Sequence, residues 1–296
     1  MAQFYSCQKV PVELNSYLDN DSMKFIRKIV EHYAELPTIH ATHKVFRYAN
    51  ESEGYVIKLY NNNESKANEI TWISEINRNG FRKVPEIVDS FERIVVFKYV
   101  DFPELSGPTG LWNTSNSVDV VAKIIFHDFG KVFQRKELID AHYYKKTANI
   151  SMGIFNKFTL PYLKSTQATV IESYLERVSQ IKMFSLESYI CHGSLFTCNI
   201  LFSEVFKDFC IIDWEKAHIG DKNRDYAAFF FSAWVGDAFQ TNIDQNKTID
   251  VFAADTSFNS FLFNYWLIYY ALRWSCNPMF TNKAFNFLST FTLIDE

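Results

Sequence analysis

The sequence predicts an α+β protein with two lobes, in which a small antiparallel sheet with one helix precedes a mainly helical half. Three observations lead to this fold class. The predicted elements of the first lobe run strand, strand, helix, strand, strand; a stretch rich in Pro and Gly follows; and apolar residues beyond it repeat at helical spacing. We therefore expect an N-terminal lobe over residues 1–100, a linker over 101–110 and a helical C-terminal lobe over 111–296.

The elements of the first lobe follow from local patterns. Asp21 or Ser22 fits the N-cap of an N-terminal helix, a polar turn over 50–54 joins the first two strands, and Gly80 ends the second helix. The expected elements are a helix over 22–35, strands over 44–48 and 55–60, a helix over 64–79, and strands over 86–91 and 93–100.

The second lobe is predicted from helical periodicity. Apolar residues at helical spacing indicate a long helix over 118–133 and another over 161–184. Short strands are expected over 199–202 and 209–214, on either side of a polar turn. From residue 226 onward aromatic residues are frequent, and we expect helices whose aromatic side chains dominate the core.

Composition and charge argue against several classes of protein. The net charge of -4 gives no basic footprint for a nucleic acid partner. The five cysteines are odd in number and form no C-x-x-C pair, so neither a disulfide framework nor a zinc site is expected. The most apolar stretch, 261–274, is interrupted by Asn264 and Arg273 and is too short for a membrane span. The first residues lack the apolar run of a secretory signal, so we expect a reducing, cytoplasmic location.

A lysine and a glutamate of the first lobe could act together. Lys58 shares a strand face with Val56, because strand side chains alternate with a period of two residues. It could reach the phosphates of a nucleotide while Val56 lies against the base. Glu69, on the following helix, could pair with Lys58 and hold it in place. Each residue alone has a simpler interpretation, as a solvated lysine on an edge strand and an exposed glutamate on a helix.

Three ordered segments of the second lobe carry a resemblance to a known family. Residues 192–201 read HGSLFTCNIL, residues 211–215 read IIDWE and residues 220–227 read GDKNRDYA. They resemble the patterns His-Gly-Asp-Leu-x-x-x-Asn-Ile-Leu, Ile-Asp-Trp-Glu and Gly-Asp-x-x-x-Asp-Leu-Ala of the phosphotransferases that include aminoglycoside phosphotransferases and choline and homoserine kinases. The resemblance covers roughly residues 40–240. It implies a protein-kinase-like fold for the two lobes.

The resemblance also implies a cofactor and its ligands. Asn199 and Asp213 would hold Mg²⁺, which bridges the phosphates of ATP or GTP and neutralises developing charge. The alternative for Asp213 is an ordinary turn residue at the end of a strand. The segment 96–100, which contains Phe97 and Tyr99, would be the hinge whose backbone groups meet the base of the nucleotide.

Other residues of the pattern would have supporting roles. His192 would brace the catalytic loop, and Asp221 and Asp225 would order the loop and helix that follow them. The triplet Asp-Phe-Gly at 128–130 spells the metal motif of protein kinases, but it precedes the catalytic segment and lies inside a predicted helix. We interpret it as a coincidence. The nucleotide loop, whose tip would be near residues 41–43, contains no glycine, although Thr42 could still contact phosphate.

Ser194 is the main departure from the family pattern, because it stands where the catalytic aspartate is expected. A serine hydroxyl can hydrogen-bond a substrate hydroxyl, but it is a far weaker base near neutral pH. No other acid lies within residues 191–200. General-base assistance typically contributes about 10²–10⁴-fold to a rate. Ser194 could instead be a hydrolase nucleophile, but it lacks the G-x-S-x-G elbow, and His218 has no evident partner in the sequence.

Three functions stay open at this point. The first is a nucleotide-binding, kinase-like protein that transfers phosphate slowly or not at all, as a pseudokinase would. The second is an active kinase that uses ATP or GTP to phosphorylate a hydroxyl of an amine- or sugar-like small molecule. The third is a factor of a biosynthetic pathway that binds a protein partner or a peptide. The sequence does not name the acceptor or the partner.

Overall fold

The computed structural model describes residues 10–32, 34–36, 43–50, 53–106, 112–139, 141–181, 187–239 and 242–290. These residues form two compact units, which are considered separately. The first unit comprises Met1–Pro103, Leu201–Ser203 and Phe209–Lys216, and the second comprises Glu104–Ile200, Glu204–Asp208 and Ala217–Glu296. The linker expected over 101–110 lies partly outside the described residues, and the predicted lobe boundaries stay predictions.

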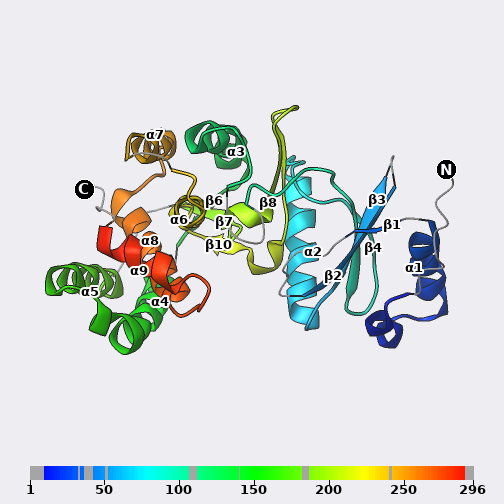
Figure 1. Cartoon of the computed structure of the whole chain (residues 1–296), viewed down its shortest axis with the longest axis horizontal. Coiled ribbons are helices and arrows are strands. Elements are labelled where there is room, and N and C mark those ends of the chain that lie inside the picture. Colours follow the sequence, from blue (N-terminus) through cyan, green and yellow to red (C-terminus); the bar gives the residue numbers. More distant parts are fainter. Residues whose placement is uncertain are drawn as a thin grey trace. The chain divides into compact units, whose positions relative to one another are not determined.

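The first unit is an antiparallel sheet with a helix on each face (Figure 1). Its strands lie in the order β1-β2-β3-β5-β4. The elements are a 3-10 helix Val12–Tyr17, α1 Asn20–His32, β1 Ala34–Leu36, β2 Lys44–Ala49, β3 Gly54–Leu59, α2 Asn63–Arg78, β4 Ile87–Ser90 and β5 Ile94–Lys98. The strand, strand, helix, strand, strand order expected from the sequence is therefore confirmed, and the three-residue strand β1 is an addition to it.

The two faces of the sheet are distinguished by alternation along β3. Ile57 is fully buried in a core that includes Ile26 and Ile29 of α1. Lys58 follows it and points to the opposite face, toward α2. Position 54, where β3 begins, requires glycine, because a Cβ there would lie 2.7 Å from the carbonyl oxygen of Tyr48, which is too close for any other residue.

The helix ends of the first unit refine the sequence prediction. The prediction that Asp21 or Ser22 caps α1 is wrong, because the Asp19 carboxylate accepts the backbone N–H of Ser22 at 2.8 Å. Asn62 caps α2 in the same way, with its side-chain oxygen 2.8 Å from the N–H of Ser65. Each helix therefore begins one or two residues before the position expected from periodicity.

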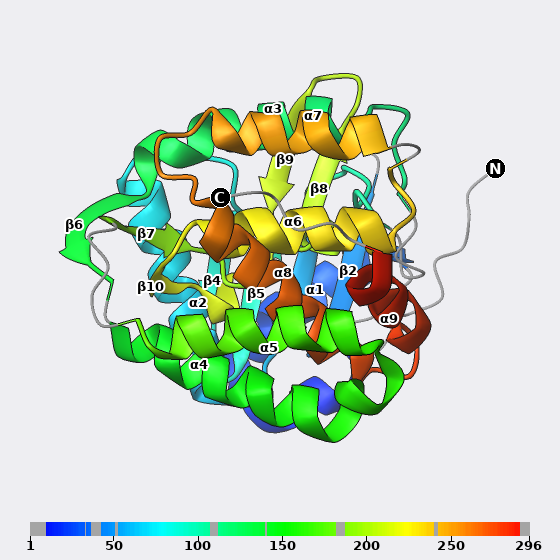
Figure 2. The same ribbon diagram turned by 90° about the vertical axis from the view of Figure 1, so that its left-hand side faces the viewer.

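The second unit is mainly helical and also contains a small sheet (Figure 2). Strands β6, β7 and β10 form this sheet in the order β10-β7-β6. Strands β8 Ile200–Ser203 and β9 Asp208–Ile211 pair with each other and contribute residues to both units. The remaining elements are α3 Val118–Val132, β6 Gln134–Leu138, α4 Ala141–Ile154, α5 Ser165–Ser179, β7 Glu187–Cys191, β10 His218–Gly220, α6 Asn223–Val235, α7 Asn242–Ala253, α8 Ser260–Ser275 and α9 Thr281–Thr290.

Helix α8 lies at the centre of the second unit and packs against α4, α6 and α9 (Figure 2). Its Trp266 is fully buried, as are Phe229, Phe230 and Phe231 of α6. The aromatic core expected for this part of the sequence is confirmed.

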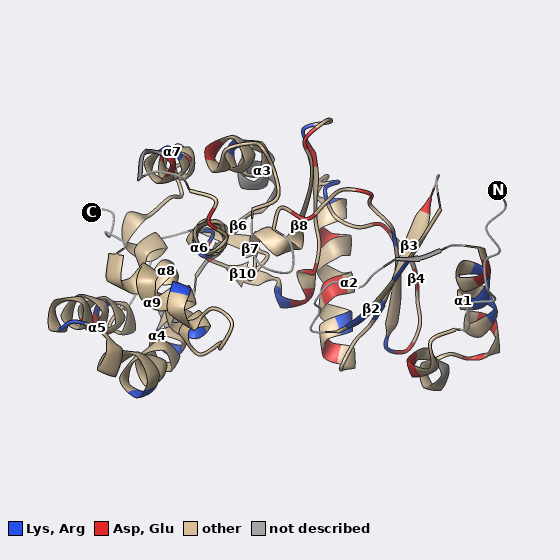
Figure 3. Cartoon of the chain, in the orientation of Figure 1, with Lys and Arg blue, Asp and Glu red and all other residues tan. Residues whose placement is uncertain are grey.

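Along α1 and α2 of the first unit, basic and acidic residues are interspersed (Figure 3). In the part of the chain that the structure describes, no helix has both the length and the apolar character needed to cross a membrane.

Two predictions about the second unit need correction. The helix expected over 161–184 begins only at Ser165, because Pro161 lies in a short 3-10 helix and Leu163 is extended, and it ends at Ser179. The strand expected over 209–214 ends at Ile211, because Asp213 has a left-handed backbone with φ 68°. The Asp-Phe-Gly triplet at 128–130 lies within α3, as predicted.

Candidate functional site

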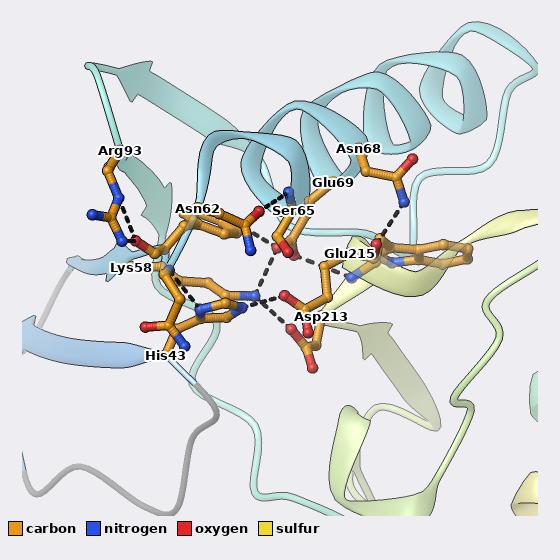
Figure 4. Close-up of polar contacts among 12 residues, drawn as sticks. His43, Lys58, Asn62, Ser65, Asn68, Glu69, Arg93, Asp213 and Glu215 are labelled. Atoms are coloured by element: carbon orange, nitrogen blue, oxygen red, sulfur yellow. Dashed lines mark hydrogen bonds and ion pairs between the residues drawn. The ribbon is translucent and has the colours of Figure 1, made fainter.

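Lys58 lies between two carboxylates of the first unit (Figure 4). Its Nζ is 2.7 Å from Oε2 of Glu69 on α2 and 2.5 Å from Oδ1 of Asp213 after β9. The three residues come from separate segments, and all three were predicted as site residues. The side chain of Lys58 is 9% exposed and that of Glu69 2%, whereas that of Asp213 is 29% exposed. Asp213 is thus the most exposed member of the group.

Burial and charge set the protonation of this group. Burial opposes the positive charge of Lys58, but the carboxylates of Glu69 and Asp213 outweigh it and raise the pKa of Lys58. The lysine is therefore charged throughout the physiological range. Burial raises the pKa of Glu69, and the adjacent ammonium group of Lys58 opposes that shift. The charged pair is stable only as long as both partners are present.

Further hydrogen bonds fix Glu69 in position. The hydroxyl of Tyr60 donates to Oε2 at 2.5 Å, and the backbone N–H of Trp214 donates to Oε1 at 3.1 Å. The ring of Tyr60 also lies 4.8 Å from Nζ of Lys58, in a cation–π contact. Since Trp214 directly follows Asp213, Glu69 ties the helix α2 to the segment that carries the second carboxylate.

A second polar link, between His43 and Glu215, was not predicted (Figure 4). Both side chains are 4% exposed. Nδ1 of His43 accepts the backbone N–H of Asn61 at 3.1 Å, so the ring proton is on Nε2 and is donated to the Glu215 carboxylate. Asn68 donates from its side-chain nitrogen to the Glu215 carbonyl at 2.5 Å. Thr42, which was expected to contact phosphate, lies outside the described residues.

The residues expected to meet the base of a nucleotide lie on neighbouring strands. Val56 of β3 pairs with Phe97 of β5, so their side chains share one face of the sheet. The N–H of Tyr99 donates to the carbonyl of Gly54 at 2.9 Å, and that of Lys98 donates to the backbone carbonyl of Glu86 at 2.8 Å. These two hinge N–H groups are therefore engaged within the first unit.

In the second unit, Asp225 holds the segment that contains Ser194. Its two carboxylate oxygens accept the backbone N–H groups of His192 at 2.6 Å and Gly193 at 2.9 Å. Gly193 has φ 80°, a conformation that glycine adopts without strain. Burial raises the pKa of Asp225 to about 7, and the two N–H groups oppose the shift. Asp225 was expected to order the loop and helix after it, but these contacts are with the segment before it.

Ser194 and Asn199 are held by backbone hydrogen bonds. The Ser194 carbonyl accepts the side-chain N–H of Asn199 at 2.8 Å and the N–H of Phe196 at 2.7 Å. The Ser194 residue is buried, and its Oγ has no hydrogen-bond partner among the residues that the structure describes. No described histidine therefore activates this hydroxyl. That finding argues against the hydrolase interpretation.

His192 and Asp221 have the supporting contacts expected of them. Nδ1 of His192 accepts the N–H of Ser194 at 3.3 Å. Asp221 accepts the N–H of Asn223 at 2.9 Å, where α6 begins, and the indole N–H of Trp266 at 2.7 Å. His218 instead contacts Tyr143, with 3.0 Å between the hydroxyl and Nε2.

The oxygen atoms of Asp213 and Asn199 suit Mg²⁺ in type, because this hard cation prefers carboxylate and amide oxygens. The side-chain nitrogen of Asn199 donates to the Ser194 carbonyl, so its amide oxygen, which lies 3.8 Å from Sγ of Cys198, is the atom that would face a metal. Within the described ranges, no group of three or more His, Cys, Asp and Glu side chains could hold a metal by itself.

Comparisons with known proteins give a result only at the level of structure. No family model matches the sequence, and no curated protein matches it. The GDP complex of aminoglycoside 2'-phosphotransferase-IIIa is 10% identical, with a TM-score of 0.62 and coverage of 86% of this chain and 91% of that chain. Macrolide 2'-phosphotransferase type I is 12% identical, with a TM-score of 0.59 and coverage of 93% and 99%. Choline kinase LicA from Streptococcus pneumoniae is 15% identical, with a TM-score of 0.55 and coverage of 91% and 92%. At such identities the likeness establishes the fold, and this chain has the α+β, protein-kinase-like fold of the aminoglycoside, macrolide and choline phosphotransferases.

Proposed function

We propose that this protein binds a nucleotide together with Mg²⁺ and transfers phosphate slowly or not at all. The observation that carries the proposal is Lys58, whose ammonium group lies between Glu69 and Asp213 in the first unit. Such a lysine–glutamate pair, next to a partly exposed aspartate, has the groups needed to bind phosphates and a metal ion.

Lys58 is the residue proposed to contact the phosphates. An ammonium group has three N–H donors, and among the described residues two of them are used, by Glu69 and Asp213. The third is free for a phosphate oxygen. Glu69 is buried and has two further donors, so its role is to hold Lys58 in place rather than to contact the ligand.

Asp213 and Asn199 are the proposed ligands of Mg²⁺. Around Lys58, two carboxylates face one ammonium group, and the excess negative charge favours a cation. When bound, Mg²⁺ would neutralise phosphate charge. The solved relatives support a nucleotide as the ligand, because one is a GDP complex of an aminoglycoside phosphotransferase and another is an AMP complex of spectinomycin phosphotransferase.

The base of the nucleotide is proposed to lie against Val56 and Phe97, near the hinge segment 96–100. Their paired positions on β3 and β5 support this, since the side chains share a face. The N–H groups of Lys98 and Tyr99 already have acceptors, so other backbone groups of the hinge would recognise the base. Both ATP and GTP are therefore included in the tests.

Ser194 is proposed to limit catalysis. Its hydroxyl is a weak base, and the loss of general-base assistance costs about 10²–10⁴-fold. Phosphoryl transfer depends mainly on positioning and electrostatics, so residual activity is expected. A kinase that would otherwise turn over at about 10 s⁻¹ would fall to about 10⁻¹–10⁻³ s⁻¹. A wild-type rate of about 10 s⁻¹ would instead identify an active small-molecule kinase.

Calorimetric titration with ATP and GTP, with and without Mg²⁺, tests the binding part of the proposal. We expect Mg²⁺-dependent binding to the wild type and its loss in Lys58→Ala and Asp213→Ala. Lys24→Ala is the matched control, because it removes an exposed lysine that pairs with Asp21 on α1 at 3.1 Å. No heat at millimolar nucleotide, or equal binding by all four proteins, would contradict the proposal.

A further inference from the structure

Among the described residues of the second unit, no carboxylate lies within ion-pair distance of the Arg224 guanidinium group, although its charge acts on the buried carboxylate of Asp225. Arg224 lies in the first turn of α6 and forms no ion pair with any described residue. The nearby lysine, Lys222, pairs with Asp255. The carboxylates on either side of Arg224 in the sequence are engaged elsewhere, that of Asp225 by backbone N–H groups and that of Asp221 by Asn223 and Trp266.

All hydrogen-bond partners of Arg224 are neutral acceptors. Nη1 donates to the hydroxyl of Tyr143 at 2.7 Å and to Nε2 of His218 at 3.1 Å, and Nε donates to the hydroxyl of Tyr270 at 3.3 Å. Because an arginine nitrogen can only donate, Nε2 of His218 is an acceptor. The hydroxyl of Tyr143, 3.0 Å away, therefore donates to this nitrogen as well. The two N–H groups of Nη2 have no acceptor among the residues described.

The half-buried Arg224 lies against buried aromatic rings. The guanidinium carbon lies 5.2 Å from the ring centre of Trp266 and 5.9 Å from that of Tyr269, and both rings are buried. Arg224, Tyr143 and His218 are only half-buried. A charged, directional donor pair at the edge of an apolar surface is suited to an anionic group of a small ligand.

Two hydrogen bonds in series connect Arg224 to the segment of the proposed catalytic position. Tyr270, which accepts from Arg224, donates its hydroxyl proton to the Gly193 carbonyl at 3.4 Å, and Gly193 directly precedes Ser194. A ligand bound at Arg224 would therefore lie near the residue that faces the acceptor hydroxyl in a phosphotransferase.

We propose that Arg224 binds the carboxylate of a small hydroxylated molecule, which is the phosphate acceptor of this protein. The role of this molecule as phosphate acceptor rests on the proposed function, whereas the carboxylate site itself does not. A monoanion fits better than a dianion, because one arginine supplies one positive charge and the carboxylates of Asp221 and Asp225 are close in sequence and buried. This ligand class differs from the amine- or sugar-like acceptors expected from the resemblance.

The test uses the protein without nucleotide, so that it is independent of nucleotide binding. Glycerate and gluconate are titrated by calorimetry at constant ionic strength, with glycerol and sorbitol as neutral counterparts and inorganic phosphate as the dianion. We expect saturable binding of at least one of the two carboxylates and none of its neutral counterpart. Arg224→Gln should weaken that binding by about 10-fold or more, because it removes a charge-assisted hydrogen bond.

Matched variants make the result specific. Arg177→Gln is the control, since Arg177 is an exposed arginine of the same unit whose guanidinium lies over Phe261 at 4.4 Å. It should bind the carboxylate as the wild type does, and Arg224→Gln should retain nucleotide binding. Arg224→Lys keeps the charge without the planar fork and should be intermediate. If the Arg224 variants do not fold, bound ligand should still slow the modification of wild-type Arg224 by phenylglyoxal.

Three results would overturn the proposal. They are no saturable binding of either carboxylate, undiminished binding by folded Arg224→Gln, and binding of phosphate as tight as that of the carboxylates. Failure of the wild type to bind ATP or GTP would contradict the proposed function but would not affect the proposal of a carboxylate site.

Discussion

His43 and Glu215 form a buried hydrogen bond between residues that are 172 positions apart in the sequence. The Asn61 N–H occupies Nδ1 of the ring, so His43 is a neutral donor to the carboxylate. His43 directly precedes β2, and Glu215 lies two residues after Asp213. The bond therefore holds the start of a strand to the segment that carries the exposed carboxylate of the proposed site.

The first prediction concerns this bond. His43→Phe should lower the free energy of unfolding by about 3 kcal/mol, because it leaves Glu215 buried without its donor. His43→Gln, which can still donate, should lose less. Urea unfolding measures both. His32→Gln is the control, because His32 is exposed and, among the described residues, hydrogen-bonds to the Lys28 carbonyl; it should change stability by no more than about 0.5 kcal/mol. A His43→Phe protein as stable as the wild type would contradict the role given to the bond.

The second prediction concerns the pair of Lys58 and Glu69. Lys58→Met should lower the free energy of unfolding by about 3–5 kcal/mol, because Glu69 is then buried without a cation. Glu69→Gln in the same chain should recover part of this loss, since the uncompensated charge is removed while an acceptor for Tyr60 is kept. A double-mutant cycle by denaturant unfolding measures the coupling. Simple additivity of the two changes would show that the residues do not depend on each other.

The third prediction concerns pH and Asp225. Burial raises the pKa of Asp225 from 3.8 to about 7, so between these values the folded state binds more protons than the unfolded state. Stability from this group is therefore present at low pH and is lost as the pH rises toward 7. Relative to Asp225→Asn, the wild type should lose about 2–3 kcal/mol between pH 5 and pH 7. Unfolding curves at both pH values test this, and a difference that stays constant with pH would refute it.

The sequence was most informative where a local pattern carries the structure. Strand-like runs next to polar turns predicted four strands of the first unit, and Gly80 correctly marked the end of α2. Strand β1, Ala34–Leu36, was missed because the helix expected over 22–35 was continued beyond its actual end at His32, and three residues are too few for a period-two pattern to be recognised. The early end of β9 was missed because a left-handed aspartate at position 213 has no signature in composition.

The site was predictable only in part, because contacts between side chains from distant segments leave no pattern in a single sequence. Lys58 and Glu69 could be named from their places on a predicted strand and the helix after it, and Asp213 from the segment IIDWE; the structure brings the three together. The partnerships of His43 with Glu215 and of Arg224 with Tyr143 could not be named. Each depends on side chains from distant segments meeting in the folded protein, and no periodicity or spacing in a single sequence records such a meeting.

The last prediction concerns Ser194, whose buried hydroxyl has no hydrogen-bond partner among the described residues. We expect the wild type to transfer phosphate slowly or undetectably, because the proposed phosphate and metal ligands supply electrostatic stabilisation while a proton acceptor is missing. Ser194→Asp should raise turnover, including hydrolysis of ATP by water, by about 10-fold or more. Ser194→Ala is the control and should not. Steady-state assays of phosphate release and of transfer to a panel of hydroxylated acceptors measure this. Unchanged turnover in Ser194→Asp would mean that more than the base has diverged and would favour a binding role. If the wild type and Ser194→Ala both turned over at ordinary kinase speed, this position would not limit the chemistry.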